Sequence, residues 1–241
     1  MTQGSNEHAG LADRALIQMG ALCAIIGALV FMAANIVHPR SPNIQVTAFQ
    51  VETVAHSDIW VTDHLLLLLG GLLLLPGLLA IQRSIPTGPG AAWAELGNSG
   101  AVVSTAIWAV LIAVDGFSSK VVHGAWASAP DAEKAVALRV AEAMEQIDVG
   151  IFSVYIIVFF GVTFMLYGLA VAKSGRFPQW LGWAAFGLGL ASFLDGIAQG
   201  YTGLSVLVTN ILFASFSSFQ TLWILTMGVL LWRARGNRTG M

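Results

Sequence analysis

Acidic and histidine side chains gather at one end of nearly every long apolar stretch of this 241-residue chain. Four of them adjoin or lie within such stretches: Asp63, His64, Asp115 and Asp195. A carboxylate beside an imidazole can orient a base, relay a proton or complete a metal site. Because charge at membrane depth is costly, ionisable residues placed there are functional candidates by default. The sequence therefore predicts catalytic roles for these four residues.

Asp63 and His64 are adjacent and directly precede an unbroken leucine run. If their helix begins near Val54, the 3.6-residue period places four side chains on one face: His56, Trp60, Asp63 and His64. The alternative is an interfacial helix end, where tryptophan, histidine and aspartate meet headgroups and water.

Asp115 follows an apolar run that begins at Trp108, and Asp195 lies far along a later run. A carboxylate just inside an apolar boundary can act as an acid. The alternative for Asp115 is a pairing with Lys120 or a turn cap. Asp195 shares a helical face with Gln199, one turn away. Its alternative role is an interhelical hydrogen bond that fixes packing.

A wider set of residues is expected to line a substrate pocket: Trp60, Trp108, Asp148, Gln199, Phe216 and Trp223. Asp148 is the last of three acids spaced three residues apart, and the alternative is a solvated acidic face that favours the helix dipole. Aromatic side chains of the last apolar stretch are expected mainly to pack. They could also hold an isoprenoid or acyl chain, and their faces can stabilise a cation.

Composition indicates the elements that must position these residues. Apolar residues make up 56% of the chain and charged residues 10%, against roughly a quarter charged in soluble proteins, and the mean hydropathy is +0.77. Since about 20 residues cross a bilayer, we predict an all-α bundle of about six membrane-spanning helices. Their expected ranges are 15–37, 59–81, 96–119, 149–172, 180–197 and 204–232. They form one membrane domain over 15–232, between a polar N-terminus, 1–14, and a basic tail, 233–241.

The distribution of basic residues predicts an orientation. An even number of spans places both termini on one side, with most of the cations: Arg14, Arg83, Lys173, Arg176, Arg233, Arg235 and Arg238. By the positive-inside rule, both termini are then cytoplasmic, and segments 39–58 and 120–147 are extracytoplasmic. Segment 39–58 is expected to be an irregular cap, and the part of 120–147 after Pro130 a helix, because strong helix formers dominate it. Reporter fusions that place 120–147 in the cytoplasm would contradict this topology.

Three short motifs carry a resemblance: DHLLLLLGGLLLLPGLLAIQRSI, the DGF of the third stretch, and FPQWLGW of an inner loop. Together they resemble bacterial six-span integral membrane proteins of unknown function, over most of the chain. The resemblance implies a multi-pass protein of the inner (plasma) membrane, and it implies no activity.

The absence of several motifs excludes some classes of enzyme and binding site. The chain has no HExxH, Walker or GxSxG motif, and no aspartate-rich motif for diphosphate and magnesium. Its single cysteine, Cys23, rules out a disulfide framework and a cysteine metal cluster. No basic stripe suggests a nucleic-acid partner. We expect no metal and no cofactor, with a haem between His64 and His123 as a minor alternative.

These observations together predict an outward-facing pocket that carries out non-redox acid–base chemistry. Asp115 or Asp195 would donate a proton, and Asp63 with His64 would orient or accept one. The expected reaction is of the cyclase, isomerase or lyase type, on a lipid or isoprenoid that enters from the membrane. Two alternatives stay open: a proton- or cation-coupled binding or transport protein, and a non-catalytic membrane component. Membrane lipids are expected partners, and the sequence makes no prediction of oligomeric state.

Overall fold

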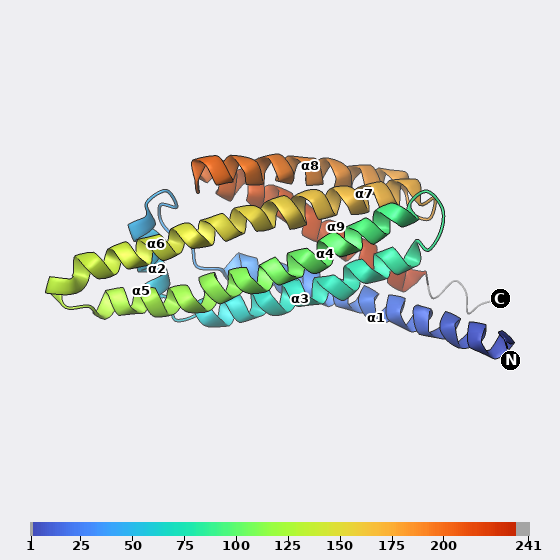
Figure 1. The fold of residues 1–241 in the computed structure, drawn as a ribbon, viewed down its shortest axis with the longest axis horizontal. Coiled ribbons are helices and arrows are strands. Elements are labelled where there is room, and N and C mark those ends of the chain that lie inside the picture. Colours follow the sequence, from blue (N-terminus) through green and yellow to red (C-terminus); the bar gives the residue numbers. More distant parts are fainter. Residues whose placement is uncertain (1, 235–241) are drawn as a thin grey trace.

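The computed structural model describes residues 2–234, and this part of the chain is all-α (Figure 1). Six of its helical stretches are long and apolar enough to cross a membrane: Asp13–Val37, Trp60–Ser84, Ala91–Ser128, Asp131–Lys173, Gln179–Thr202 and Val206–Arg233. The predicted fold class, a helical membrane protein with six candidate spans, is therefore confirmed.

The first half of the chain contains the helices α1 (Thr2–Val37), α2 (Thr47–His56), α3 (Trp60–Ser84), α4 (Ala91–Ile112), η1 (Ala113–Ser118) and α5 (Ser119–Ser128). The second half contains α6 (Asp131–Tyr155), η2 (Ile156–Thr163), α7 (Phe164–Lys173), α8 (Gln179–Thr202), η3 (Val206–Phe213) and α9 (Ala214–Arg233). The segments η1, η2 and η3 are π-helical. The segments η1 and η2 lie within the third and fourth spans and are continuous with the α-helices on both sides, whereas η3 begins the sixth span and continues into α9.

Several helix boundaries differ from the predicted ones. The second span begins at Trp60, close to its predicted start at residue 59. The helix does not begin near Val54, as a face shared with His56 would require, because extended backbone at Ser57 separates α3 from α2. His56 consequently ends a different helix, is exposed, and does not share a face with Asp63. Segment 39–58 is not wholly irregular, since it contains α2.

The chain ends also differ in part from expectation. The predicted polar segment 1–14 continues the first helix, since α1 begins at Thr2. The predicted helix after Pro130 is present as α6, which runs without a break into the fourth span. Most of the predicted basic tail, 235–241, lies outside the described residues.

Basic residues end several helices at one end of the bundle. The first turns of α1 and the end of α9 lie at one end, together with the α3–α4 and α7–α8 connections (Figure 1). Basic residues occupy the last turns of three helices there: Arg83, Lys173 and Arg233. The opposite end holds α2, α5 and the start of α6. Both termini of the bundle thus share one end, and which end faces the cytoplasm stays a prediction.

Small residues bring α1 and α3 into close contact. A Cβ added at Gly70 would lie 3.0 Å from Cα of Phe31, and one at Gly77 would lie 2.7 Å from Cβ of Ala24. Such small side chains let helix backbones approach closely in lipid. The tight α1–α3 pair fixes the start of α3 beside the end of α1, where the candidate site lies.

Candidate functional site

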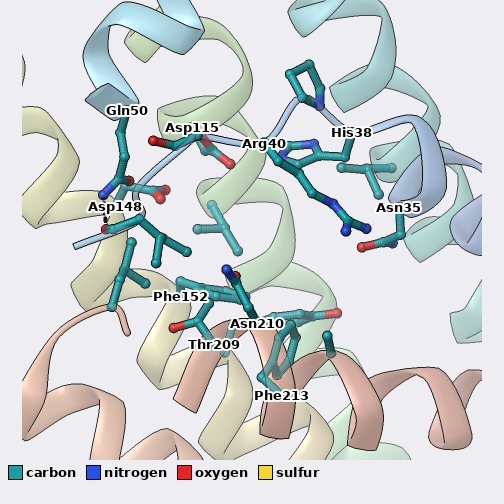
Figure 2. Close-up of a pocket in the computed structure, with 18 of the residues that line it drawn as sticks. Asn35, His38, Arg40, Gln50, Asp115, Asp148, Phe152, Thr209, Asn210 and Phe213 are labelled. Atoms are coloured by element: carbon teal, nitrogen blue, oxygen red, sulfur yellow. Dashed lines mark hydrogen bonds between the residues drawn. The ribbon is translucent and has the colours of Figure 1, made fainter. Parts of the chain in front are cut away.

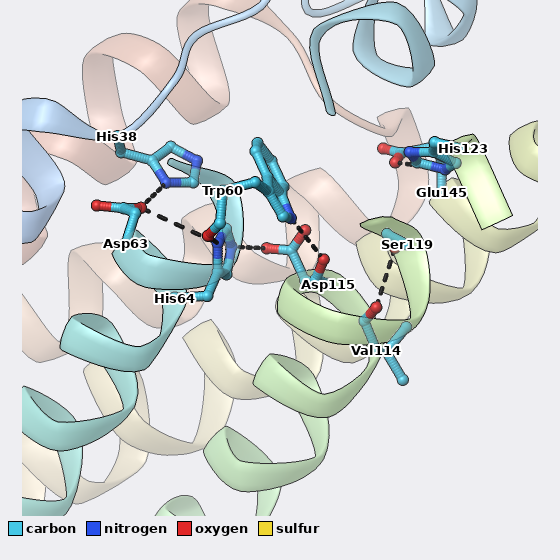
Figure 3. Close-up of polar contacts among 9 residues, drawn as sticks. All are labelled: His38, Trp60, Asp63, His64, Val114, Asp115, Ser119, His123 and Glu145. Atoms are coloured by element: carbon cyan, nitrogen blue, oxygen red, sulfur yellow. Dashed lines mark hydrogen bonds and ion pairs between the residues drawn. The ribbon is translucent and has the colours of Figure 1, made fainter. Parts of the chain in front are cut away.

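Four titratable side chains form a row across the end of α1, the first turn of α3, and η1 (Figure 3). His38 Nδ1 lies 2.6 Å from Asp63 Oδ2, which lies 4.0 Å from His64 Nδ1, and His64 Nε2 lies 3.0 Å from Asp115 Oδ2. We call these residues the acid–histidine row. The structure thus brings together three of the four predicted catalytic residues and adds His38.

Trp60 holds the row in place. Its indole Nε1 donates a 2.9 Å hydrogen bond to the backbone carbonyl of Asp115, which ties η1 to the first turn of α3. Its ring centroid lies 4.5 Å from that of His64 and 5.2 Å from that of His38. Since Trp60 itself is buried, it is a rigid support for both imidazoles.

Gly116, in the DGF motif, allows η1 to approach α3 this closely. A Cβ added there would lie 2.6 Å from Cβ of His64 and 3.0 Å from its Cγ. Carbon atoms in ordinary contact are about 3.5–4.0 Å apart, so any larger residue would push the two segments apart. The glycine therefore makes possible the contact between His64 and Asp115.

Both ring nitrogens of His64 face hydrogen-bond acceptors. Nδ1 lies 2.7 Å from the backbone carbonyl of Trp60, and a carbonyl can only accept. Nδ1 must therefore donate, so the 3.0 Å contact between Nε2 and Asp115 needs one further proton. That proton resides either on the imidazole, as imidazolium, or on the Asp115 carboxyl. The His64–Asp115 pair therefore holds a proton that it can exchange.

The two ends of the row line a cavity of about 350 Å³, near the lower limit for pockets that bind drug-sized molecules. The side chains of His38 and Asp115, which line it, are 29% and 26% exposed. The side chains between them are buried, at 1% for Asp63 and 0% for His64. A buried acid–histidine pair thus joins two groups that open into the same space.

The cavity has polar and aromatic walls (Figure 2). Carboxylates come from η1 and α6, and Arg40 follows the end of α1. Aromatic side chains form much of the rest: Trp60, Trp108, Phe152, Tyr155, Phe160 and Phe213. The rings of Trp108 and Tyr155 stack with centroids 4.9 Å apart. These walls suit a molecule with a polar head and an apolar body.

All three π-helical segments contribute to this cavity. Asp115 belongs to η1 and Phe160 to η2, while Thr209, Asn210 and Phe213 belong to η3. Departures from α-helical geometry are rare and are often found at functional sites. Their meeting around one cavity is a signal independent of residue chemistry.

Only some of the predicted pocket residues line the cavity. Trp60, Trp108 and Asp148 line the cavity, whereas Gln199, Phe216 and Trp223 do not. The Gln199 amide donates to Ser153 Oγ and accepts from Thr209 Oγ1, and the Trp223 indole donates to the Leu181 carbonyl. Phe216 is half-buried outside the lining. Hydrogen bonds between packed helices therefore account for the positions of Gln199 and Trp223.

Asp195 is also away from the row. It lies on α8, which packs against α6, η2, α7, η3 and α9, and it does not line the cavity. Its side chain is buried, and neither carboxylate oxygen has a hydrogen-bond partner among the described residues. The structure therefore does not bring Asp195 together with Asp63, His64 and Asp115.

Metal or haem binding at His64 would require ring nitrogens that are already engaged. His38, Asp63 and His64 each place one ligand atom within 4.8 Å of the others, a spacing that could hold a metal ion. His64 Nδ1, however, is bonded to the Trp60 carbonyl, and its Nε2 contacts Asp115. His123 Nε2 lies 3.3 Å from Glu145 Oε1, and neither ring nitrogen of His123 has a hydrogen-bond partner among the described residues. The haem alternative, between His64 and His123, gains no support from this arrangement.

Among the histidine, arginine and acidic residues that line the cavity, three were not predicted as site residues: His38, Arg40 and Glu145. His38 and Arg40 follow the first span directly, which left an interfacial role as the simpler interpretation. Glu145 belongs to the three-residue acid pattern that also contains Asp148, and this spacing was the signal that could have indicated it.

Comparisons with protein-family models, with curated proteins and with solved structures give no match to this chain. Its function must therefore be inferred from its own residues.

Proposed function

We propose that this membrane protein is an acid–base enzyme that moves a proton within an amphiphilic molecule held in the cavity. The observation that carries the proposal is that His38 and Asp115 both line one cavity, while Asp63 and His64 join them behind its wall. An acid and a base facing one substrate, with a return path between them, meet the needs of an isomerase.

In the proposed reaction, the His64–Asp115 pair donates its proton to one atom of the substrate. His38 removes a proton from another atom. The proton taken up by His38 then returns through Asp63 to His64, so that no oxidant, reductant or net proton is consumed. The 4.0 Å gap between Asp63 Oδ2 and His64 Nδ1 is longer than a hydrogen bond. Because Nδ1 already carries the proton that it donates to the Trp60 carbonyl, the imidazole must leave that carbonyl and turn over, so that Nε2, which the donation emptied, accepts the proton from Asp63.

The aromatic side chains of the cavity wall favour a substrate with an apolar part. Trp108 and Tyr155 are both buried core residues that also line the cavity. Apolar walls around a few convergent polar groups are typical of small-molecule sites. A lipid or isoprenoid that enters between helices would place its polar end at the acid–histidine row.

Deuterium transfer tests the proposal. Detergent-purified protein is incubated in D₂O with a total lipid extract, and the retained amphiphiles are analysed by mass spectrometry. We expect the wild type to place deuterium on carbon, and Asp63→Asn to retain the same amphiphile with exchange about 100-fold slower, since general acid–base catalysis contributes roughly 10²–10⁴-fold. Asp58→Asn is the matched control, because Asp58 is exposed and does not line the cavity.

Unchanged exchange in Asp63→Asn would show that the row carries no proton. Binding by the wild type without any exchange would instead favour the second candidate, proton-coupled binding or transport. That candidate uses the same observation, because a row that opens into a cavity inside a membrane bundle can also bind and release a proton with a ligand.

A further inference from the structure

We propose that the cavity selects an amphiphile with a zwitterionic headgroup, whose ammonium group faces Asp115, Glu145 and Asp148 and whose phosphate faces Arg40. This inference rests on the proposed function in one respect only, that the cavity is the substrate site. It is carried by the placement of opposite charges on different walls of that cavity.

The anionic wall is formed by η1 and the adjoining part of α6. Glu145 and Asp148 are three residues apart on α6, and both line the same cavity as Asp115. Glu145 is buried, and Asp148 Oδ1 is buried without a hydrogen-bond partner among the described residues. Like charges held together away from water are costly. A cation bound between these carboxylates would remove both the repulsion and the unsatisfied acceptor.

An organic ammonium fits this wall better than a metal ion. Within the described part of the chain, the three carboxylates do not form a group whose ligand atoms lie close enough to share one ion. Metal ions need oxygen ligands at about 2.0–2.6 Å, whereas an ammonium group is larger and is bound by hydrogen bonds. Trp60, Trp108 and Tyr155 also line this space, and aromatic faces attract organic cations.

The cationic wall is formed by the segment that follows α1. Arg40 lines the cavity, and no described residue accepts a hydrogen bond from its guanidinium. Figure 2 shows Arg40 reaching toward Asn35, on the side of the cavity away from Asp148, with His38 next to it. A guanidinium binds phosphate or carboxylate through two parallel hydrogen bonds. This wall therefore suits the anionic part of a headgroup.

The size of the cavity sets how much of the molecule it encloses. A volume of about 350 Å³ suits a headgroup with the first carbons of a chain. Phe152, Phe160 and Phe213 line the apolar part of the space. The remainder of the chain would then extend between helices into the lipid phase. A phosphoethanolamine amphiphile has both charges and one such chain, so it is the probe of choice.

Equilibrium binding to the full-length protein in an uncharged detergent tests the inference, with three probes of equal chain length. They are a single-chain phosphoethanolamine, a single-chain phosphoglycerol that lacks the cation, and an alkylamine that lacks the anion. We expect the phosphoethanolamine to bind at least tenfold more tightly than either of the others. A diacyl phosphoethanolamine, presented in nanodiscs, separates a bilayer lipid from a single-chain ligand as the source.

Two variants test which wall binds which charge of the headgroup. Arg40→Gln should weaken the binding of phosphoethanolamine and phosphoglycerol about tenfold and leave the alkylamine unchanged. Asp148→Asn should weaken phosphoethanolamine and alkylamine and leave phosphoglycerol unchanged. Arg139→Gln is the control for Arg40, because Arg139 is exposed on α6 and does not line the cavity. Thermal unfolding of each variant checks that it is folded.

Equal affinities for the three probes would overturn the inference, as would an Arg40→Gln variant that binds all of them like the wild type. Failure of this inference and failure of the proposed function are distinguishable. Tight phosphoethanolamine binding without deuterium exchange leaves the zwitterion site standing and refutes the enzyme. Exchange into an uncharged amphiphile that binds equally well refutes the zwitterion site and leaves the enzyme standing.

Discussion

The substitution Gly116→Ala tests whether the contact between η1 and α3 creates the site. The added Cβ would lie 2.6 Å from Cβ of His64, and ordinary carbon contacts begin at about 3.5 Å. The two segments must therefore separate by roughly 1 Å. If that displacement is fully transmitted, the 3.0 Å contact between His64 Nε2 and Asp115 Oδ2 lengthens to roughly 4 Å, which is beyond a hydrogen bond.

Two costs contribute to the expected destabilisation. Overpacking a closely packed contact costs about 1–3 kcal/mol, and losing a hydrogen bond to a charged group costs about 1.5–3 kcal/mol. Because both costs come from one displacement, we expect a total of about 2–4 kcal/mol rather than their sum. For a chain of this size, each kcal/mol lowers the Tm by about 2–4 °C. The expected decrease is therefore about 4–16 °C.

The assay combines thermal unfolding in detergent with NMR of ¹⁵N-histidine-labelled protein, in which the Nε2 chemical shift of His64 reports its hydrogen bond with Asp115. Gly124→Ala is the matched control, since it lies on α5 in the same span and a Cβ there would meet nothing within 4 Å. The control should keep the His64 signal and unfold at the same temperature or slightly higher, because alanine favours helix by about 1 kcal/mol. If Gly116→Ala behaves like this control, the glycine does not position the site.

Two further substitutions test other parts of the structure. Lys120→Met removes three hydrogen bonds from Nζ to the carbonyls of Val54, Ala55 and Ser57, at 3.0, 2.9 and 2.7 Å. It should destabilise the attachment of α2 by about 2–4 kcal/mol, seen as faster amide hydrogen exchange in α2, and unchanged exchange there would refute the role of the lysine. Asp195→Asn removes a buried charge without a hydrogen-bond partner, so it should raise the free energy of unfolding, because a neutral amide costs less to bury than a carboxylate, and leave amphiphile retention unchanged. If this variant loses the retained amphiphile, Asp195 contributes to the binding site.

Hydropathy predicted the six spans because crossing a membrane sets a minimum length of apolar residues that any arrangement must meet. It also placed the acids and histidines at one end, since alternating spans return corresponding positions to the same side. It did not predict that α2 would form as a separate helix before α3, where extended backbone at Ser57 ends the first of the two. Local polarity is similar on both sides of that break, so no periodic signal marks it.

The residues of the site were predicted less completely than the spans. Asp63, His64 and Asp115 come together, whereas Asp195 and Gln199 lie elsewhere, although all of them are polar residues in apolar surroundings. Helical periodicity gives the angular position of a residue on its own helix, and it says nothing about which neighbour that face meets. The π-helical segments add to the difficulty, because each inserts residues that rotate everything after it.

The sequence by itself determined that the chain is a six-span helical bundle with ionisable residues concentrated at one end, because these properties depend on length, hydropathy and alternation alone. Only the tertiary structure decided that His38 contacts Asp63, that Gly116 allows Asp115 to reach His64, and that both ends of this row line one cavity. The reason is physical. Contacts between helices depend on their rotation and depth, and these are set by the close packing of all neighbours at once.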